Sequence, residues 1–203
     1  MIGIIDYGMG NLGSVVNACR FLELPAEIVA APDGFSQCRA LILPGVGAFG
    51  DCVRNLDTRG FTEPLRAWIE ADRPLLGICL GLQLLFENSE ESPGVPGLGI
   101  LRGTVRRLPA RPGYKIPHMG WNEVEIRRPG PLFADLPSRF HAYFVHTFFV
   151  DPADPACVAA ETDYTRRYAC AVQRGRLAAV QFHPEKSHQA GLTLLRNFAR
   201  ANS

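Results

Sequence analysis

Short apolar runs alternate with stretches of helical periodicity in the first half of the chain. The apolar runs, each short enough for a buried strand, cover residues 1–6, 26–30, 40–43 and 75–78. The intervening helices are predicted around Val15, Cys19 and Leu22, which repeat at i, i+4 and i+7, and over 61–72 and 80–88. This alternation favours the α/β class, with a central, mostly parallel sheet and helices on both faces.

The second half has a different pattern, in which strand-like runs follow one another with turns between them. These runs cover residues 99–108, 121–127, 141–150, 157–162, 168–173 and 176–182. The last two predict a hairpin, so we expect an additional antiparallel strand region in the C-terminal half. Segments 89–98 and 109–119 are predicted loops, and an amphipathic helix is predicted over 187–201.

Composition excludes several classes of protein. A chain of 203 residues can bury a core without disulfides or metals, and we expect residues 1–203 to form a single domain. The net charge is +1 and the 21 basic residues are scattered, so nothing favours a nucleic-acid or membrane partner. The N-terminus lacks the basic region of a signal peptide, and no apolar run approaches the length of a membrane span.

Cysteine usage indicates a reducing compartment. None of the six cysteines has a neighbouring cysteine at the two- or three-residue spacing of zinc or redox motifs. No cluster of histidine, aspartate or glutamate has metal-ligand spacing either. We therefore expect reduced thiols, a cytoplasmic location, no metal and no cofactor.

Cys79 is the candidate nucleophile. It lies in Gly77-Ile-Cys79-Leu-Gly81, between a predicted buried strand and a predicted helix. A sharp strand-to-helix turn strains the backbone of its central residue, and flanking glycines avoid the clashes that such a turn causes. The thiol would project from the carboxyl end of the sheet, with the helix N-terminus favouring its thiolate. A small buried core cysteine is the competing interpretation.

His183 and Glu185 are the candidate base and its orienting acid. They end the apolar run 177–182 as His183-Pro184-Glu185. Residues i and i+2 of a strand share a face, so Glu185 can hold one imidazole nitrogen while the other takes the thiol proton. Alone, this tripeptide fits a surface turn equally well; with Cys79 it completes a nucleophile–base–acid set. The other histidines are expected to be solvent-facing (His118, His188) or structural (His141).

Several segments together resemble the class I (triad) glutamine amidotransferases. The shared segments are GICLGLQ, QFHPEKS and PGVGAFGD. KIPHMGWNEV, AYFVHTFFV and IIDYGMGNLGSV narrow the resemblance to the glutaminase subunits of imidazole glycerol phosphate synthase, a histidine-biosynthesis enzyme. The resemblance extends over essentially the whole chain and implies the flavodoxin-like amidotransferase fold.

The resemblance also implies roles for particular residues. Cys79 would form a thioester with L-glutamine and release ammonia, with His183 as general acid/base and Glu185 as its partner. The oxyanion would be bound by backbone amides of Val46, Gly47 and Leu80. The substrate would be bound by Gln83, Glu91, His146, Thr147 and Phe148. Without the family, Gln83 and Glu91 would be interpreted as polar residues exposed to solvent, as most such residues are.

A partner is implied in the same way. The similar subunits form a heterodimer with a (β/α)₈ cyclase, which uses the ammonia to make imidazole glycerol phosphate and an aminoimidazole carboxamide ribotide. The resemblance places at or near that interface Asn11, Lys115, Pro117, Met119, Trp121 and Lys186. Trp121 suits an interface anchor, and a half-buried structural tryptophan is equally consistent with the sequence. The glycine-rich segment 44–50 is the candidate mobile element.

Three alternatives remain at this point. One is a class I glutaminase of another synthase, such as that for pyridoxal phosphate or anthranilate, against which PGVGAFGD and KIPHMGWN argue. Another is a thiol or α/β hydrolase, whose triad places the acid before the histidine, whereas Glu185 follows His183. The third is an inactive scaffold of the same fold, against which the intact triad argues.

Overall fold

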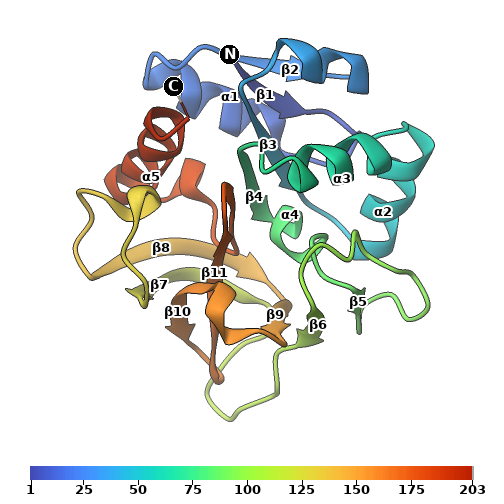
Figure 1. Ribbon diagram of the computed structural model, residues 1–203. Helices are drawn as coiled ribbons and strands as arrows, with labels where there is room; N and C mark the ends of the chain where they lie inside the picture. The colour runs from blue at the N-terminus through green and yellow to red at the C-terminus, as the bar shows by residue number, and fades with distance from the viewer. Residues whose placement is uncertain (203) are drawn as a thin grey trace.

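The computed structural model describes residues 1–202 and has a parallel sheet at its centre (Figure 1). Its strands are β1 (Ile2–Ile5), β2 (Ala26–Val29), β3 (Ala40–Gly45), β4 (Leu75–Cys79) and β12 (Leu177–Val180). They pair in the order β2-β1-β3-β4-β12, and all four pairings are parallel. The four predicted strands of the first half are confirmed, with β3 two residues longer than expected.

Helices cover both faces of this sheet. They are α1 (Leu12–Phe21), α2 (Phe49–Thr58), α3 (Thr62–Glu70), α4 (Leu80–Gln83) and α5 (His188–Arg200). The apolar residues of α1 and α5 pack with Ile4 of β1 in one core cluster, whereas those of α2 and α3 pack with Ile5 in a second cluster. Neighbouring residues of a buried strand thus point to opposite layers, which is why both are apolar. Within residues 1–202, none of the helices has the length and apolar character that a membrane crossing requires.

Two helices differ from the sequence-based prediction. No helix was predicted between β3 and residue 61, yet α2 forms there, and the backbone N–H groups of Phe49 and Gly50 are capped by the side chains of Glu91 (2.7 Å) and Ser92 (3.0 Å). The helix predicted over 80–88 is wrong beyond α4. The carbonyls that would continue it, those of residues 84–87, accept hydrogen bonds from the backbone of residues 97–101 instead.

The remaining strands extend the sheet in antiparallel fashion. They are β5 (Asn88–Ser89), β6 (Gly103–Arg107), β7 (His118–Ile126), β8 (Arg139–His146), β9 (Phe148–Pro152), β10 (Val158–Asp163) and β11 (Arg167–Arg174). All their pairings are antiparallel except that of the short β5 with β6. The β11–β12 hairpin is confirmed, and it joins this region to the parallel half. The predicted loop 109–119 is two residues too long, since β7 begins at His118. Short 3-10 helices occur at η1 (Pro32–Gln37), η2 (Pro131–Phe133), η3 (Pro155–Cys157) and η4 (Pro184–Lys186).

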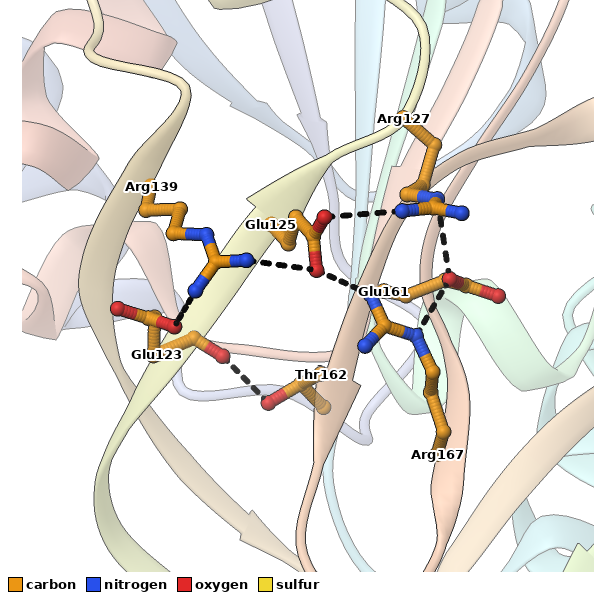
Figure 2. A network of polar contacts seen from close by, with 7 residues as sticks. All are labelled: Glu123, Glu125, Arg127, Arg139, Glu161, Thr162 and Arg167. Atoms are coloured by element: carbon orange, nitrogen blue, oxygen red, sulfur yellow. Dashed lines mark hydrogen bonds and ion pairs between the residues drawn. The ribbon is translucent and has the colours of Figure 1, made fainter.

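A charged network lies across the strands of the antiparallel region (Figure 2). Its ionic members are Glu123, Glu125, Arg127, Arg139, Glu161 and Arg167. Glu125 of β7 pairs with three arginines and Glu161 of β10 with two, so the positive charges are matched by carboxylates. Such exposed pairs contribute little individually, although together they pair each of the three arginines with a carboxylate.

Two glycines let the chain turn sharply at the end of β4. A side chain on Gly81 would place its Cβ atom 1.9 Å from the carbonyl oxygen of Leu43 in β3. A Cβ on Gly77 would lie 2.8 Å from the carbonyl oxygen of Gly81. The turn therefore requires direct contact between backbone segments, and only glycine at both positions permits it.

This contact predicts that Gly81→Ala lowers the free energy of unfolding by about 2–3 kcal/mol, because the backbone of β3 or α4 must shift to make room. The matched control is Gly13→Ala in α1, where an added Cβ meets nothing within 4 Å. Helix propensity then predicts stabilisation by up to about 1 kcal/mol. Urea denaturation measures both, and equal effects of the two substitutions would contradict the packing argument.

Candidate active site

Cys79 is the last residue of β4 and adopts a strained conformation. Its φ is 55° and its ψ is −108°, a region that side-chain-bearing residues rarely occupy. The side chain is largely buried and lines a cavity of about 380 Å³. The predicted strand-to-helix elbow is thus present, although α4 is a single turn, which makes the helix-dipole part of the sequence argument weaker than expected.

The cavity brings together most of the residues expected at the site. Besides Cys79 it is lined by Val46, Gly47, Leu80, Gln83, Glu91, Pro117, Val145, His146, Thr147, Phe148, His183 and Lys186. Four of the residues expected near a partner interface lie outside its lining, namely Asn11, Lys115, Met119 and Trp121. Segments from both halves of the chain therefore meet around the thiol.

His183 and Glu185 form a buried pair beside the cavity. The imidazole Nδ1 lies 2.8 Å from the Glu185 Oε1 atom, and both side chains are almost fully shielded from solvent. Burial by itself would lower the pKa of His183, but interactions with Cys79 and Glu185 outweigh it and raise that pKa to about 10. The Nε2 atom is buried without a hydrogen-bond partner among the described residues, so it is available to a reacting group.

The expectation that His183 and Glu185 pair because they lie two apart on one strand is wrong. β12 ends at Val180, and Glu185 lies in the 3-10 helix η4, whose first residue is Pro184. Three hydrogen bonds hold the backbone of His183, two with other backbone groups and one with the Ser187 hydroxyl. Its N–H donates to the Tyr143 carbonyl (2.9 Å), its carbonyl accepts from Ser187 Oγ (2.6 Å) and also from the N–H of Lys186 (3.0 Å). A tight turn, rather than an extended strand, therefore brings base and acid together.

The backbone amides expected to bind an oxyanion lie on two segments. Leu80 is the first residue of α4, and the N–H groups of a first helical turn have no partner within the helix. Gly47 adopts a φ of +97°, which glycine alone adopts freely. The Val46 carbonyl accepts from the Cys52 thiol in α2 (3.6 Å), so the following N–H, that of Gly47, points away from Cys52 across the planar peptide.

The Phe148 carbonyl organises one wall of the cavity. It accepts a hydrogen bond from Gln83 Nε2 (2.9 Å) and lies 2.9 Å from Nδ1 of His146. Because a carbonyl only accepts, His146 must donate from Nδ1, and its Nε2 accepts from the Tyr168 hydroxyl (2.9 Å). Glu91, expected to bind the substrate ammonium, also lines the cavity but holds the N-terminus of α2.

His118 is buried, contrary to the expectation that it faces solvent. It stacks between Phe144 and Tyr164, and its Nδ1 lies 3.0 Å from the Tyr168 hydroxyl. Burial lowers the pKa of His118 to about 4 and that of His146 to about 3, so both are neutral. His141, expected to be structural, is exposed on β8, whereas His188 is exposed at the start of α5 as predicted.

Sequence reasoning missed two residues of this network. Gln181 is fully buried and connects Gln83 with Cys79, and Tyr168 connects the two buried histidines. For Gln181 a signal was present, because an amide at the end of the apolar run 177–182 must find hydrogen-bond partners when that strand is buried. No comparable signal marked Tyr168, which fits a strand position without any polar role.

The cavity has a strained cysteine at the end of a parallel strand and a buried His–Glu pair that follows a later strand. This is the architecture of the class I glutamine amidotransferases. The family model for "Glutamine amidotransferase class-I" matches residues 3–201. A crystal structure of a glutamine amidotransferase superposes with a TM-score of 0.76 at 22% identity, over 98% of this chain and 97% of that chain. The predicted fold class is confirmed.

Sequence relatives narrow the class further. The imidazole glycerol phosphate synthase subunit HisH of Moorella thermoacetica is 50% identical over 197 residues, 97% of this chain and 93% of the relative. That of Syntrophotalea carbinolica is 49% identical over 203 residues, 98% of each chain. The chain therefore belongs to the class I glutamine amidotransferases and, among them, to the HisH glutaminase subunits of imidazole glycerol phosphate synthase.

The lowered pKa values of His118 and His146 predict acid-sensitive stability. The pKa values in the folded chain, about 4 and about 3, lie below the ordinary value of 6.5. Between about pH 3 and pH 6.5, the unfolded chain therefore binds up to two more protons than the folded chain. The contribution of these two histidines to stability is fully present above about pH 6.5 and is lost as the pH falls toward about 3. Urea unfolding across this range measures the slope. His118→Phe, which keeps the stacking, should flatten the slope by about one proton; an unchanged slope would contradict this assignment.

Proposed function

We propose that Cys79 attacks the side-chain amide carbon of L-glutamine and forms a glutamyl thioester. The observation that carries the proposal is the strained Cys79 thiol in one cavity with the buried His183–Glu185 pair, whose Nε2 is free. His183 holds the thiol proton, which its raised pKa keeps on the imidazole at neutral pH, and delivers it to the departing ammonia, while Glu185 orients the ring and stabilises its charge. Water, activated by the same imidazole, then hydrolyses the thioester to glutamate.

The remaining cavity residues bind the substrate and the oxyanion. The N–H groups of Leu80 and of the Val46–Gly47 segment stabilise the negative oxygen that develops in each tetrahedral intermediate. Gln83 and Glu91 contact the amino acid end of glutamine, and His146, Thr147 and Phe148, around the junction of β8 and β9, line its pocket. Glu91 supplies the carboxylate for the ammonium group, with one oxygen already engaged by α2.

The ammonia passes to a second protein. The relatives are each named as a subunit, and the proposed partner is a (β/α)₈ cyclase that makes imidazole glycerol phosphate and an aminoimidazole carboxamide ribotide. In support, Met119 and Trp121 on one face of β7 are 63% and 46% exposed, which is unusual for large apolar side chains. Trp121 stacks on His188 (4.8 Å between ring centroids), so it is held in place as an anchor. Lys115, Pro117, Lys186 and Asn11 complete the proposed interface.

The proposed mobile element is shorter than the glycine-rich segment from which it was predicted. Pro44 and Gly45 belong to β3, and Phe49 and Gly50 belong to α2, so only residues 46–48 are free to reorient. Partner binding would reorient these residues and complete the oxyanion site, which limits glutamine hydrolysis to the assembled enzyme. The idea fails if the liganded partner leaves glutaminase turnover unchanged.

The competing interpretations lose support. Relatives about 50% identical carry the HisH name, which disfavours a glutaminase of pyridoxal phosphate or anthranilate synthesis. The assembled triad disfavours an inactive scaffold. All six cysteines are free thiols, which supports a cytoplasmic setting, and we propose that residues 1–203 act there as one domain.

Cys79→Ala is expected to abolish glutamine-dependent synthesis by the two-subunit enzyme. Synthesis from added ammonium salts should persist, because the cyclase chemistry belongs to the other chain. The measurement is product formation with each nitrogen source, using wild-type enzyme as the control. Loss of both activities would mean that this chain contributes directly to the cyclase reaction.

His183→Ala and Glu185→Gln are expected to lower glutaminase turnover to different extents. Removing the imidazole removes the proton carrier, whereas the amide of Glu185→Gln still contacts Nδ1 and loses mainly the charge. Steady-state kinetics of the assembled enzyme should show the larger loss for His183→Ala. The reverse order would show that the two roles are misassigned.

A further inference from the structure

Gln181 lies between the end of β12 and the catalytic histidine and is completely buried. Its side-chain Nε2 atom is 3.8 Å from the Cys79 sulfur, within the range of a nitrogen–sulfur hydrogen bond. The carbonyl end of the same amide accepts from Gln83 Nε2 at 3.0 Å. Nothing in the triad mechanism uses this residue, although its amide contacts the reacting atom.

The orientation of the Gln181 amide follows from its neighbours. The Phe148 carbonyl can only accept, so the nitrogen of Gln83 must face it (2.9 Å). The second N–H of Gln83 then points at Gln181, which must present its oxygen there. The nitrogen of Gln181 is thereby directed at Cys79. One backbone carbonyl thus determines, through two buried amides, that the sulfur faces a donor.

On the basis of the proposed function of Cys79, we propose that Gln181 is a further catalytic residue, whose amide donates to the Cys79 sulfur and stabilises the thiolate. A donor favours the charged form of its acceptor, and the thiolate is the nucleophile. The bond is strongest when the thiol proton is on His183, because a charged sulfur accepts better than a neutral one. Gln181 therefore keeps Cys79 in its nucleophilic form and acts on thioester formation rather than on the binding of glutamine.

The test is the pH dependence of Cys79 alkylation by iodoacetamide, followed by mass spectrometry of the Cys79 peptide. In Gln181→Leu the pH at which alkylation of Cys79 is half-maximal should rise by about half to one pH unit. This is the range expected for losing one weak hydrogen bond to a charged group. With the cyclase partner, kcat/KM for glutamine should fall roughly tenfold, through kcat, with KM little changed. Gln37→Leu, an exposed amide on η1, is the matched control and should change neither value.

The titratable or charged groups that face Cys79 are the same in Gln181→Leu and Gln37→Leu as in the wild type, so they do not account for a change in the alkylation midpoint. They are His183 with Glu185 behind it, Tyr7, Cys52, and Glu91 and Lys186 in the cavity wall. An unchanged midpoint in a folded Gln181→Leu protein, verified by thermal melting, would overturn the proposal. It would indicate that Gln181 only satisfies the buried amide of Gln83.

Gln181→Glu covers the case in which the leucine variant does not fold. Glutamate has nearly the same shape and keeps an acceptor for Gln83, but it replaces the donor by an acceptor beside the sulfur. The alkylation midpoint should therefore rise at least as far as in Gln181→Leu, and an unchanged midpoint would again overturn the proposal. If wild-type turnover depends on Cys79 while both Gln181 variants behave as wild type, only this inference fails. If turnover does not depend on Cys79, the proposed function itself fails.

Discussion

The close approach of α4 to β3 is the constraint on which this site depends. Gly81 packs its backbone directly against the Leu43 carbonyl, which leaves no room for a side chain. The chain can make that approach only by turning abruptly at Cys79, and the cost is a positive φ at a residue that has a Cβ. In return, the sulfur faces a cavity instead of the core, and the strand that carries it is held rigidly by β3 and β12 on its two sides.

A second organising group is the carbonyl of Phe148, which accepts from two directions. On one side it orients Gln83, then Gln181, and so presents a donor to Cys79. On the other side it selects the tautomer of His146 and, through Tyr168, that of His118. A single acceptor in β9 thus sets the direction of every hydrogen bond along a buried path, since each group must donate where its neighbour accepts.

The antiparallel region places two kinds of surface on one face of β7. Met119 and Trp121 lie two and four residues after Pro117 of the cavity wall, and Glu123 and Glu125 continue the same face into the charged network of Figure 2. Alternation along a strand makes this arrangement unavoidable, because residues two apart share a face. The exposed apolar end suits the binding of a partner, and the neighbouring charges, already paired within the chain, keep the rest of the sheet solvated.

Local patterns in the sequence were sufficient for the four parallel strands of the first half, the β11–β12 hairpin, α5 and the elbow at Cys79, because each depends on residues close together in the chain. They also identified His183 and Glu185 as a pair, although by an incorrect geometry, since the turn of η4 and the brace from Ser187 replace the expected strand. Tertiary structure alone decided the rest. α2 forms because Glu91 and Ser92 cap it from 42 residues away, and α4 stops because residues 97–101 occupy the carbonyls that would extend it. The burial of His118 and the contact of Gln181 with Cys79 depend likewise on hydrogen bonds between segments distant in sequence, which no local pattern encodes.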